Sequence, residues 1–79
     1  MKLQSFQNTG FEFSLVFAGG ENIQVDLRPL IGDYVAEEEL SSARIDADWG
    51  CLEFRNGAVD IDPTTLYRYA ISHCASQAA

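Results

Sequence analysis

The sequence predicts an α+β fold, a small two-layer domain with an antiparallel sheet of about five strands, one C-terminal helix and a short helical turn. Three observations lead to this prediction. Apolar and polar residues alternate in two separate hairpin patterns, over residues 11–28 and 43–55, as expected of strands with one buried face. Asp62 and Pro63 then mark the start of a helix.

The chain length limits the number of domains. With 79 residues there is room for one core, so we predict a single domain over residues 1–79 whose ends, 1–5 and 75–79, fray. Domains this short bury only about 60% of their unfolded surface, which makes stabilisation by self-association a reasonable expectation. Hydrophobic residues make up 47% of the chain and charged residues 22%, as in ordinary folded domains.

The first hairpin pattern begins at residues 11–17, where phenylalanine and leucine occupy every second position. A turn cluster with two glycines covers 18–22, and residues 23–28 alternate again, which completes the hairpin. The segment from Lys2 to Gln7 is a further strand candidate beside it. Pro29 has no N–H to donate, so we expect the ladder to end there and a turn to follow.

The second hairpin pattern covers residues 43–48 and 51–55, with a turn at Trp49 and Gly50 between them. Asn56 and Gly57 both tolerate positive φ and supply a tight turn. A short strand segment is expected after that turn, because apolar residues again occupy alternate positions at 59 and 61.

Two helical segments and a hydrophobic core complete the predicted fold. Residues 35–40 are expected to form one or two helical turns, with three glutamates in water. Residues 62–73 form the C-terminal helix, since Asp62 can cap its first N–H groups and Pro63 suits the first helical position. The predicted core consists of Phe11, Phe13, Leu15, Phe17, Ile23, Val25, Leu27, Ile45, Leu52, Phe54, Leu66 and Ala70.

Charge and cysteine content exclude several classes of protein. Five Lys and Arg against twelve Asp and Glu give a net charge of −7, and the basic residues are scattered singly, so we expect no direct nucleic-acid binding. The longest apolar stretch, residues 11–18, is far shorter than the roughly 18 to 20 residues of a spanning helix, so no membrane segment is expected. The two cysteines, Cys51 and Cys74, indicate reduced thiols and a cytoplasmic location.

Several short motifs follow one another along the chain, each occurring once. They are Val25-Asp26-Leu27-Arg28-Pro29-Leu30, Gly50-Cys51-Leu52-Glu53-Phe54, Asn56-Gly57, and Asp60-Ile61-Asp62-Pro63 with Leu66-Tyr67. In this order and spacing they resemble the domain-of-unknown-function-2442 family of small bacterial proteins, from about Phe11 to Tyr69. The resemblance implies a mostly antiparallel sheet with few helices, and it implies no activity and no catalytic residues.

The sequence departs from that family at one turn. The family has Trp-Pro before the Asn-Gly turn where this chain has Phe54-Arg55, and Val59 is an extra residue before the aspartates. Some relatives carry a helix-turn-helix domain after this one, and others stand beside small partner proteins in the manner of toxin and antitoxin pairs. This company of the relatives is one motive for the hypothesis of an interaction role.

Catalytic and metal chemistry find little support in the residues. Asp60-x-Asp62 could hold a divalent cation, but helix capping already explains Asp62, so we expect no metal or cofactor and retain Asp60 and Asp62 as the candidate ligands. His73 and Cys74 are helical neighbours that point in different directions and have no third orienting group. We expect the protein not to be an enzyme, with no catalytic residues.

The candidate partner-binding residues are Trp49, Asp46, Asp48 and Glu53. We favour Trp49 folded back over the core, the alternative being an exposed binding anchor. The charge and the family resemblance predict a non-catalytic interaction module, antitoxin-like or adaptor, that binds a basic protein. Two alternatives stay open: a structural homodimer paired through open sheet edges, and a small-ligand or divalent-metal binding domain.

Overall fold

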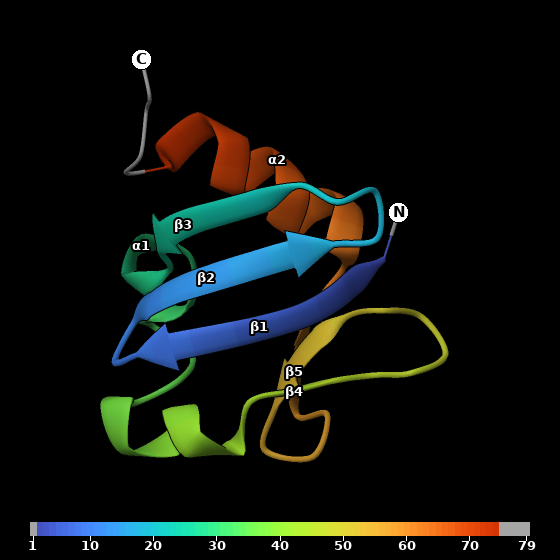
Figure 1. Ribbon diagram of the computed structural model, residues 1–79. Helices are drawn as coiled ribbons and strands as arrows, with labels where there is room; N and C mark the ends of the chain where they lie inside the picture. The colour runs from blue at the N-terminus through green and yellow to red at the C-terminus, as the bar shows by residue number, and fades with distance from the viewer. Residues whose placement is uncertain (1, 75–79) are drawn as a thin grey trace.

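The computed structural model describes residues 2–74 and is α+β, but its six strands form two three-stranded antiparallel sheets rather than one sheet of about five strands. Sheet A consists of β1 (Leu3–Thr9), β2 (Glu12–Phe17) and β3 (Asn22–Asp26), and sheet B of β4 (Arg44–Ile45), β5 (Leu52–Phe54) and β6 (Val59–Ile61). Figure 1 shows sheet A in front, with sheet B and helix α2 (Pro63–His73) behind it.

The single-sheet prediction is wrong because, within residues 2–74, no strand continues sheet A beyond β3. The chain instead enters the short helix α1 (Arg28–Ile31), which has Pro29 in its first turn, and the Ile31 N–H donates to the Leu27 carbonyl at 2.9 Å. The Tyr69 hydroxyl of α2 donates to the Asp26 carbonyl at 2.8 Å and so covers the end of the β3 edge. Alternation in a sequence shows which face of a strand is buried, but it does not show which strands are neighbours.

Sheet A itself follows the sequence pattern closely. The strand candidate from Lys2 to Gln7 corresponds to β1, which starts one residue later and runs to Thr9, and residues 3–5, which we expected to fray, lie in that strand with Leu3 buried. β1 and β2 are joined by the two-residue turn Gly10-Phe11, in which Gly10 has a φ of 60°. A type II′ hairpin turn places glycine at that position.

The second half of the chain is less regular than the sequence indicates. The predicted strand over 43–48 is reduced to the two residues of β4, and the helical turn expected over 35–40 is the 3-10 helix η1 (Glu37–Ser42). Glu39, expected in water, accepts the Ala36 N–H at 2.9 Å and lies 3.6 Å from the Arg55 guanidinium. The strand ends at Ile45 because the chain then turns, with the Gly50 N–H donating to the Asp46 carbonyl at 2.7 Å and the Asp48 N–H donating to Asp46 Oδ1 at 3.0 Å.

The tight turn and the C-terminal helix are confirmed. Asn56 and Gly57 have φ values of 58° and 91° in the turn between β5 and β6. The Asp62 carboxylate accepts the N–H groups of Thr64 at 2.9 Å and Thr65 at 3.2 Å, and Pro63 occupies the first turn of α2. Residues 75–79, also expected to fray, lie outside the described residues.

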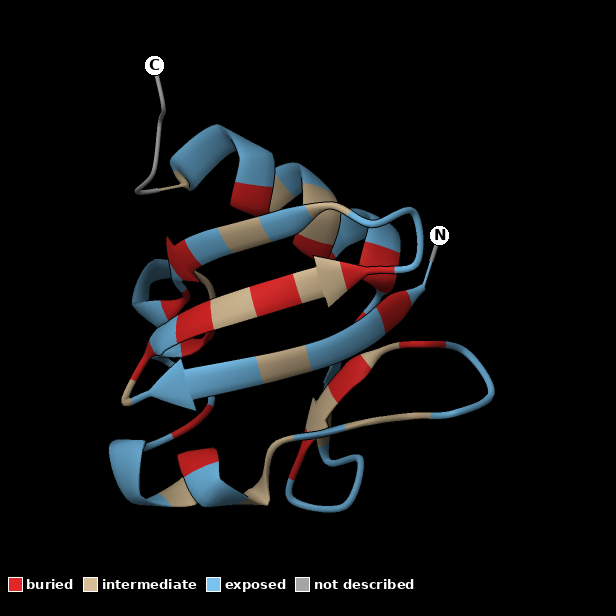
Figure 2. Ribbon diagram, viewed as in Figure 1, coloured by how far each residue is buried: buried red, intermediate tan, exposed pale blue. Residues whose placement is uncertain are grey.

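The core lies between sheet A and the layer behind it, and Figure 2 shows buried residues alternating with less buried ones along β2. Ten of the twelve predicted core residues are buried, whereas Ile23 and Ile45 are only partly buried. The buried hydrophobic residues beyond that prediction are Leu3, Ile31, Val35, Leu40 and Ile61. Phe13 of sheet A and Phe54 of sheet B pack edge to face, with ring centroids 6.3 Å apart. Within residues 2–74, no helix is long and apolar enough to cross a membrane.

Candidate functional site

The outer face of sheet B carries most of the candidate residues, in two cross-strand rows. Arg44, Glu53 and Asp60 are direct partners across β4, β5 and β6. The next inward row contains Ile45, Leu52 and Ile61. Because side chains alternate between faces, the charged row points away from the core. The strand pattern therefore concentrates charge on this face.

A second outward row follows at the end of the strands. The Asp46 N–H donates to the Cys51 carbonyl at 2.9 Å, so these residues extend the pairing of β4 with β5 by one step. Asp62 occupies the corresponding position directly after Ile61 of β6. We call Asp46, Glu53, Asp60 and Asp62 the acidic face.

One basic residue, Arg44, lies in the same rows as the residues of the acidic face. Arg44 Nε lies 2.5 Å from Glu53 Oε2, and their side chains are 59% and 12% exposed. Four carboxylates thus face one guanidinium, which leaves excess negative charge on sheet B. The alternation of charged residues at 44, 46, 53, 60 and 62 could have revealed this face from the sequence if the strand order had been known.

Cys51 lies within the field of this face. Partial burial raises the pKa of the Cys51 thiol above its usual value, and the negative charges of Asp60, Asp46, Asp62 and Glu53 raise that pKa further. A raised pKa disfavours the thiolate, which is the reactive form. Cys51 is therefore poorly suited to act as a nucleophile, and it reports on the electrostatic potential of the acidic face.

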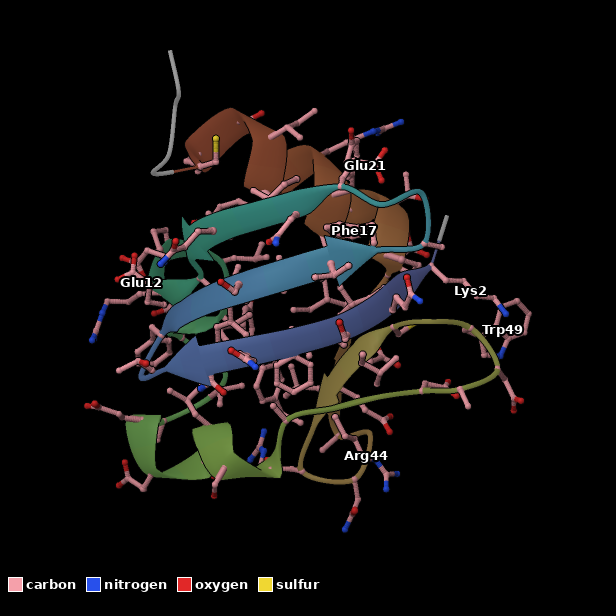
Figure 3. All side chains as sticks on the ribbon, in the orientation of Figure 1. Lys2, Glu12, Phe17, Glu21, Arg44 and Trp49 are labelled. Carbon is pink, nitrogen blue, oxygen red and sulfur yellow. The ribbon has the colours of Figure 1, made fainter. Side chains whose placement is uncertain are left out.

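Trp49 lies at the tip of the loop that joins β4 to β5, and the preference for a core position is wrong because its side chain is 72% exposed. The loop is held by a Gly50 N–H bond to the Asp46 carbonyl at 2.7 Å and by a Leu3 N–H bond to the Gly50 carbonyl at 3.1 Å. Gly50 has a φ of 73° and packs against Lys2 without room for a side chain. Figure 3 shows Trp49 and Lys2 projecting together at this end of the molecule.

The remaining candidates are separated by the fold. Asp48 lies in the loop, where its N–H donates to Asp46 Oδ1 at 3.0 Å, and it does not belong to the sheet rows. Asp60 is exposed on β6, whereas Asp62 is engaged in the cap of α2. In residues 2–74 no group of three or more His, Cys, Asp or Glu side chains is placed to hold a metal ion. The metal candidates remain a prediction without a further ligand.

The His73 and Cys74 pair is arranged as a helix end rather than as a catalytic pair. The His73 ring stacks on the Tyr69 ring with centroids 4.3 Å apart, and its Nδ1 lies 3.1 Å from the Tyr69 carbonyl oxygen. Tyr69 in turn bonds to β3 through its hydroxyl. These contacts fasten the end of α2 to sheet A.

Comparison with known proteins identifies the family. The model of the family described as protein of unknown function (DUF2442) matches residues 7–72, so the chain belongs to that family and the resemblance is confirmed. No curated protein and no solved structure matches the chain significantly.

Proposed function

We propose that this member of the family is a non-catalytic interaction module that binds a basic protein through Trp49 and the adjoining acidic face. One observation carries the proposal, the 72% exposure of Trp49 on a hydrogen-bonded loop that begins at the acidic face. An exposed tryptophan offers a large apolar surface that a partner can bury, and tryptophan is among the residues most enriched in binding hot spots.

The loop is suited to present an anchor because it is already ordered. Three backbone bonds involve its ends, from Gly50 to Asp46, from Asp46 to Cys51, and from Leu3 to Gly50. The Asp48 N–H bond to the Asp46 side chain adds a fourth. Binding therefore requires little loss of backbone freedom, and more of the contact free energy remains as affinity.

The acidic face determines the class of partner. Asp46 belongs to both the loop and the face, so a protein that receives Trp49 in a pocket lies next to the carboxylates. A rim of Lys or Arg around that pocket would be steered towards the face and would bind faster at low salt. An antitoxin-like or adaptor role in the bacterial cytoplasm fits a small module of this kind, and the unpaired Cys51 thiol is compatible with such a location.

The test compares variants in capture from an extract of the native host. The immobilised protein is expected to retain a stoichiometric basic protein that is released at about 0.5 M salt, where the Debye length falls below about 5 Å. Trp49→Ala should weaken binding of that protein by at least about tenfold. Asp46→Asn/Glu53→Gln/Asp60→Asn, which leaves the Asp62 cap intact, should slow association and flatten its salt dependence.

Each variant has a matched control elsewhere on the surface. Tyr34→Ala removes another exposed aromatic side chain, and Asp33→Asn/Glu37→Gln/Glu38→Gln removes the same number of charges outside the acidic face. Both controls should bind as the wild type does. Equal loss of affinity in a control and in its matched variant would contradict the proposal, as would retention of the partner by Trp49→Ala.

A further inference from the structure

The two edge strands of sheet A, β3 and β1, differ in what lies against them. The β3 edge lies beside α2, and the Asp26 carbonyl at its end accepts the Tyr69 hydroxyl at 2.8 Å. The Leu3 N–H of β1 bonds to Gly50, but beyond Leu3 no backbone group of β1 bonds to any element other than β2 within residues 2–74. β1 also contacts β4 of sheet B, but within the described residues no strand is hydrogen-bonded along its outer edge, which is therefore open to backbone pairing.

Beyond an irregularity at its start, the open edge carries none of the usual protection against pairing. The seven residues of β1, LQSFQNT, include no charged residue and no proline. A register shift between Leu3 and Ser5 disturbs the start of the strand, and the pairing with β2 is regular from Ser5 to Thr9. Edge strands that must stay unpaired commonly contain lysine, proline or a bulge in their middle. We call Ser5–Thr9 the free edge.

We propose that the free edge pairs with the free edge of a second copy of this chain, antiparallel and about a two-fold axis at Gln7. The two sheets A would then form one continuous sheet of six strands. In this register Gln7 faces the partner's Gln7 and Phe6 faces the partner's Asn8. A two-fold contact of this kind uses the same patch on both copies, so it closes as a dimer.

The free edge is the part of sheet A at which a second copy meets the least electrostatic repulsion. Each chain carries a net charge of −7, so two copies repel one another over most of their surfaces, but the free edge itself is uncharged. Lys2 precedes β1 at one end, and the Glu37 carboxylate lies beside Gly10 at the other end. Antiparallel pairing brings Lys2 of each copy towards the partner's Glu37, which gives two attractive contacts.

Phe6 provides the apolar part of the contact. Its ring packs against the Phe13 ring with centroids 5.7 Å apart, yet the side chain is only partly buried because the sheet ends beside it. A paired strand would cover the exposed part. The area is that of a short strand edge, so we place the dimer among the weak interfaces, below about 1,200 Å².

The proposal is independent of the proposed function, because the free edge includes neither Trp49 nor the acidic face. The test is sedimentation of the full chain between about 10 μM and about 1 mM, which covers the dissociation constants of weak dimers. The wild type is expected to shift from monomer to dimer over this range. Trp49→Ala should shift in the same way.

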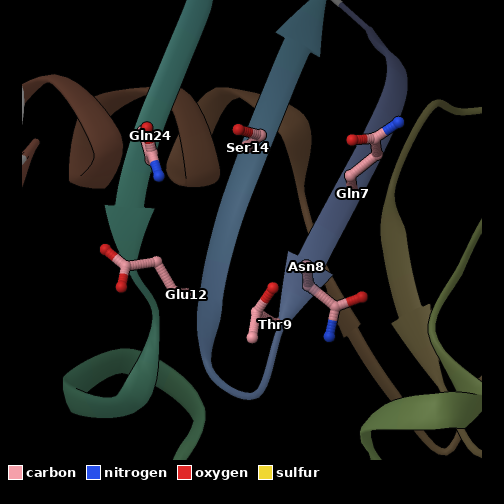
Figure 4. A pocket seen from close by; sticks show the side chains of 6 residues that line it. All are labelled: Gln7, Asn8, Thr9, Glu12, Ser14 and Gln24. Atoms are coloured by element: carbon pink, nitrogen blue, oxygen red, sulfur yellow. The ribbon is translucent and has the colours of Figure 1, made fainter.

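Two variants locate the contact. Gln7→Glu places like charges directly opposite one another and should raise the dissociation constant roughly three- to fivefold. Gln24→Glu is its matched control, because Gln7 and Gln24 flank Ser14 in one cross-strand row on opposite edges of sheet A (Figure 4). It adds the same charge and should leave the dissociation constant unchanged.

Asn8→Pro removes a backbone donor from the free edge. Thr9 and Glu12 close a two-residue hairpin, so by the alternation of antiparallel ladders the Asn8 N–H points away from β2. Proline is tolerated at such edge positions, and this variant should stay folded by circular dichroism and remain monomeric throughout. A wild type that is monomeric at about 1 mM, equal effects of Gln7→Glu and Gln24→Glu, or a dimer of folded Asn8→Pro would each overturn the proposal.

Discussion

The outer faces of the two sheets differ in chemistry, although both sheets are three-stranded, antiparallel and packed on one core. Sheet B presents four carboxylates and one guanidinium. Sheet A presents amide and hydroxyl side chains, with the acidic residues Glu12 and Asp26 confined to one end. The net charge of −7 is thus unevenly distributed, and the fold determines which surface attracts a basic partner and which one tolerates another acidic chain.

The inner faces are alike, since both sheets contribute aromatic residues to the same cluster. Phe13, Phe6 and Phe54 are in contact across the two sheets, and Phe17 packs edge to face against Tyr67 of α2 with ring centroids 5.2 Å apart. A shared core should make the sheets unfold together. A change in the shared core should therefore destabilise both sheets, whereas a change on one outer face should affect mainly the chemistry of that face.

The largest effect is expected from Phe54→Ala, which removes a fully buried ring at the junction of the sheets. Truncation of a buried phenylalanine typically costs about 3 to 5 kcal/mol of unfolding free energy, which is as much as a small domain has. We therefore expect loss of structure in both sheets, measured by urea unfolding and amide hydrogen exchange. Persistent exchange protection in sheet A would show that the sheets fold separately.

The next effect separates two aspartates of the acidic face. Asp62→Ala removes the cap of α2 and should lower the unfolding free energy by about 1 kcal/mol. Asp60→Ala, two residues earlier, removes a charge opposite Glu53 and should change the unfolding free energy by less than about 0.5 kcal/mol. Urea unfolding of the two variants measures both values, and equal losses would contradict the assignment of Asp62 as the cap.

A smaller effect on stability is expected from Arg44→Ala, which removes the only basic residue among the sheet B rows. The guanidinium is more than half exposed, so its ion pair with Glu53 should contribute less than about 1 kcal/mol. The same change makes the face more negative and should speed association with a basic partner at low salt. Slower association would show that Arg44 itself contacts the partner.

The smallest effect concerns the reactivity of Cys51, in a Cys74→Ser background so that one thiol reacts. Burial and the surrounding carboxylates raise its thiol pKa, so the thiolate forms at higher pH than in an ordinary cysteine. The rate of alkylation by iodoacetamide, a neutral reagent, should therefore start to rise at a higher pH than it does for an ordinary cysteine. Asp60→Asn removes the largest carboxylate contribution and should move the pH profile to lower pH. Glu12→Gln on sheet A is the control and should leave the profile in place.

The strands of sheet A, the Asn56-Gly57 turn and the cap of α2 could be predicted from the sequence because each depends on local rules. Alternation over residues 11–17 sets a buried face, and Asp62 with Pro63 satisfies the first N–H groups of a helix. The acidic character of the chain and its family were likewise accessible. These features involve residues that are close together in the chain or depend on composition alone.

Only the tertiary structure decided the division into two sheets, the exposure of Trp49 and the grouping of the carboxylates. Each depends on contacts between residues far apart in the chain, such as the Leu3 N–H bond to the Gly50 carbonyl and the packing of Phe13 on Phe54. Trp49 illustrates the reason: the sequence placed it in a turn, but its exposure follows from the bonds that hold the loop outward. Local propensity specifies the elements and their faces, whereas packing specifies which faces remain in water.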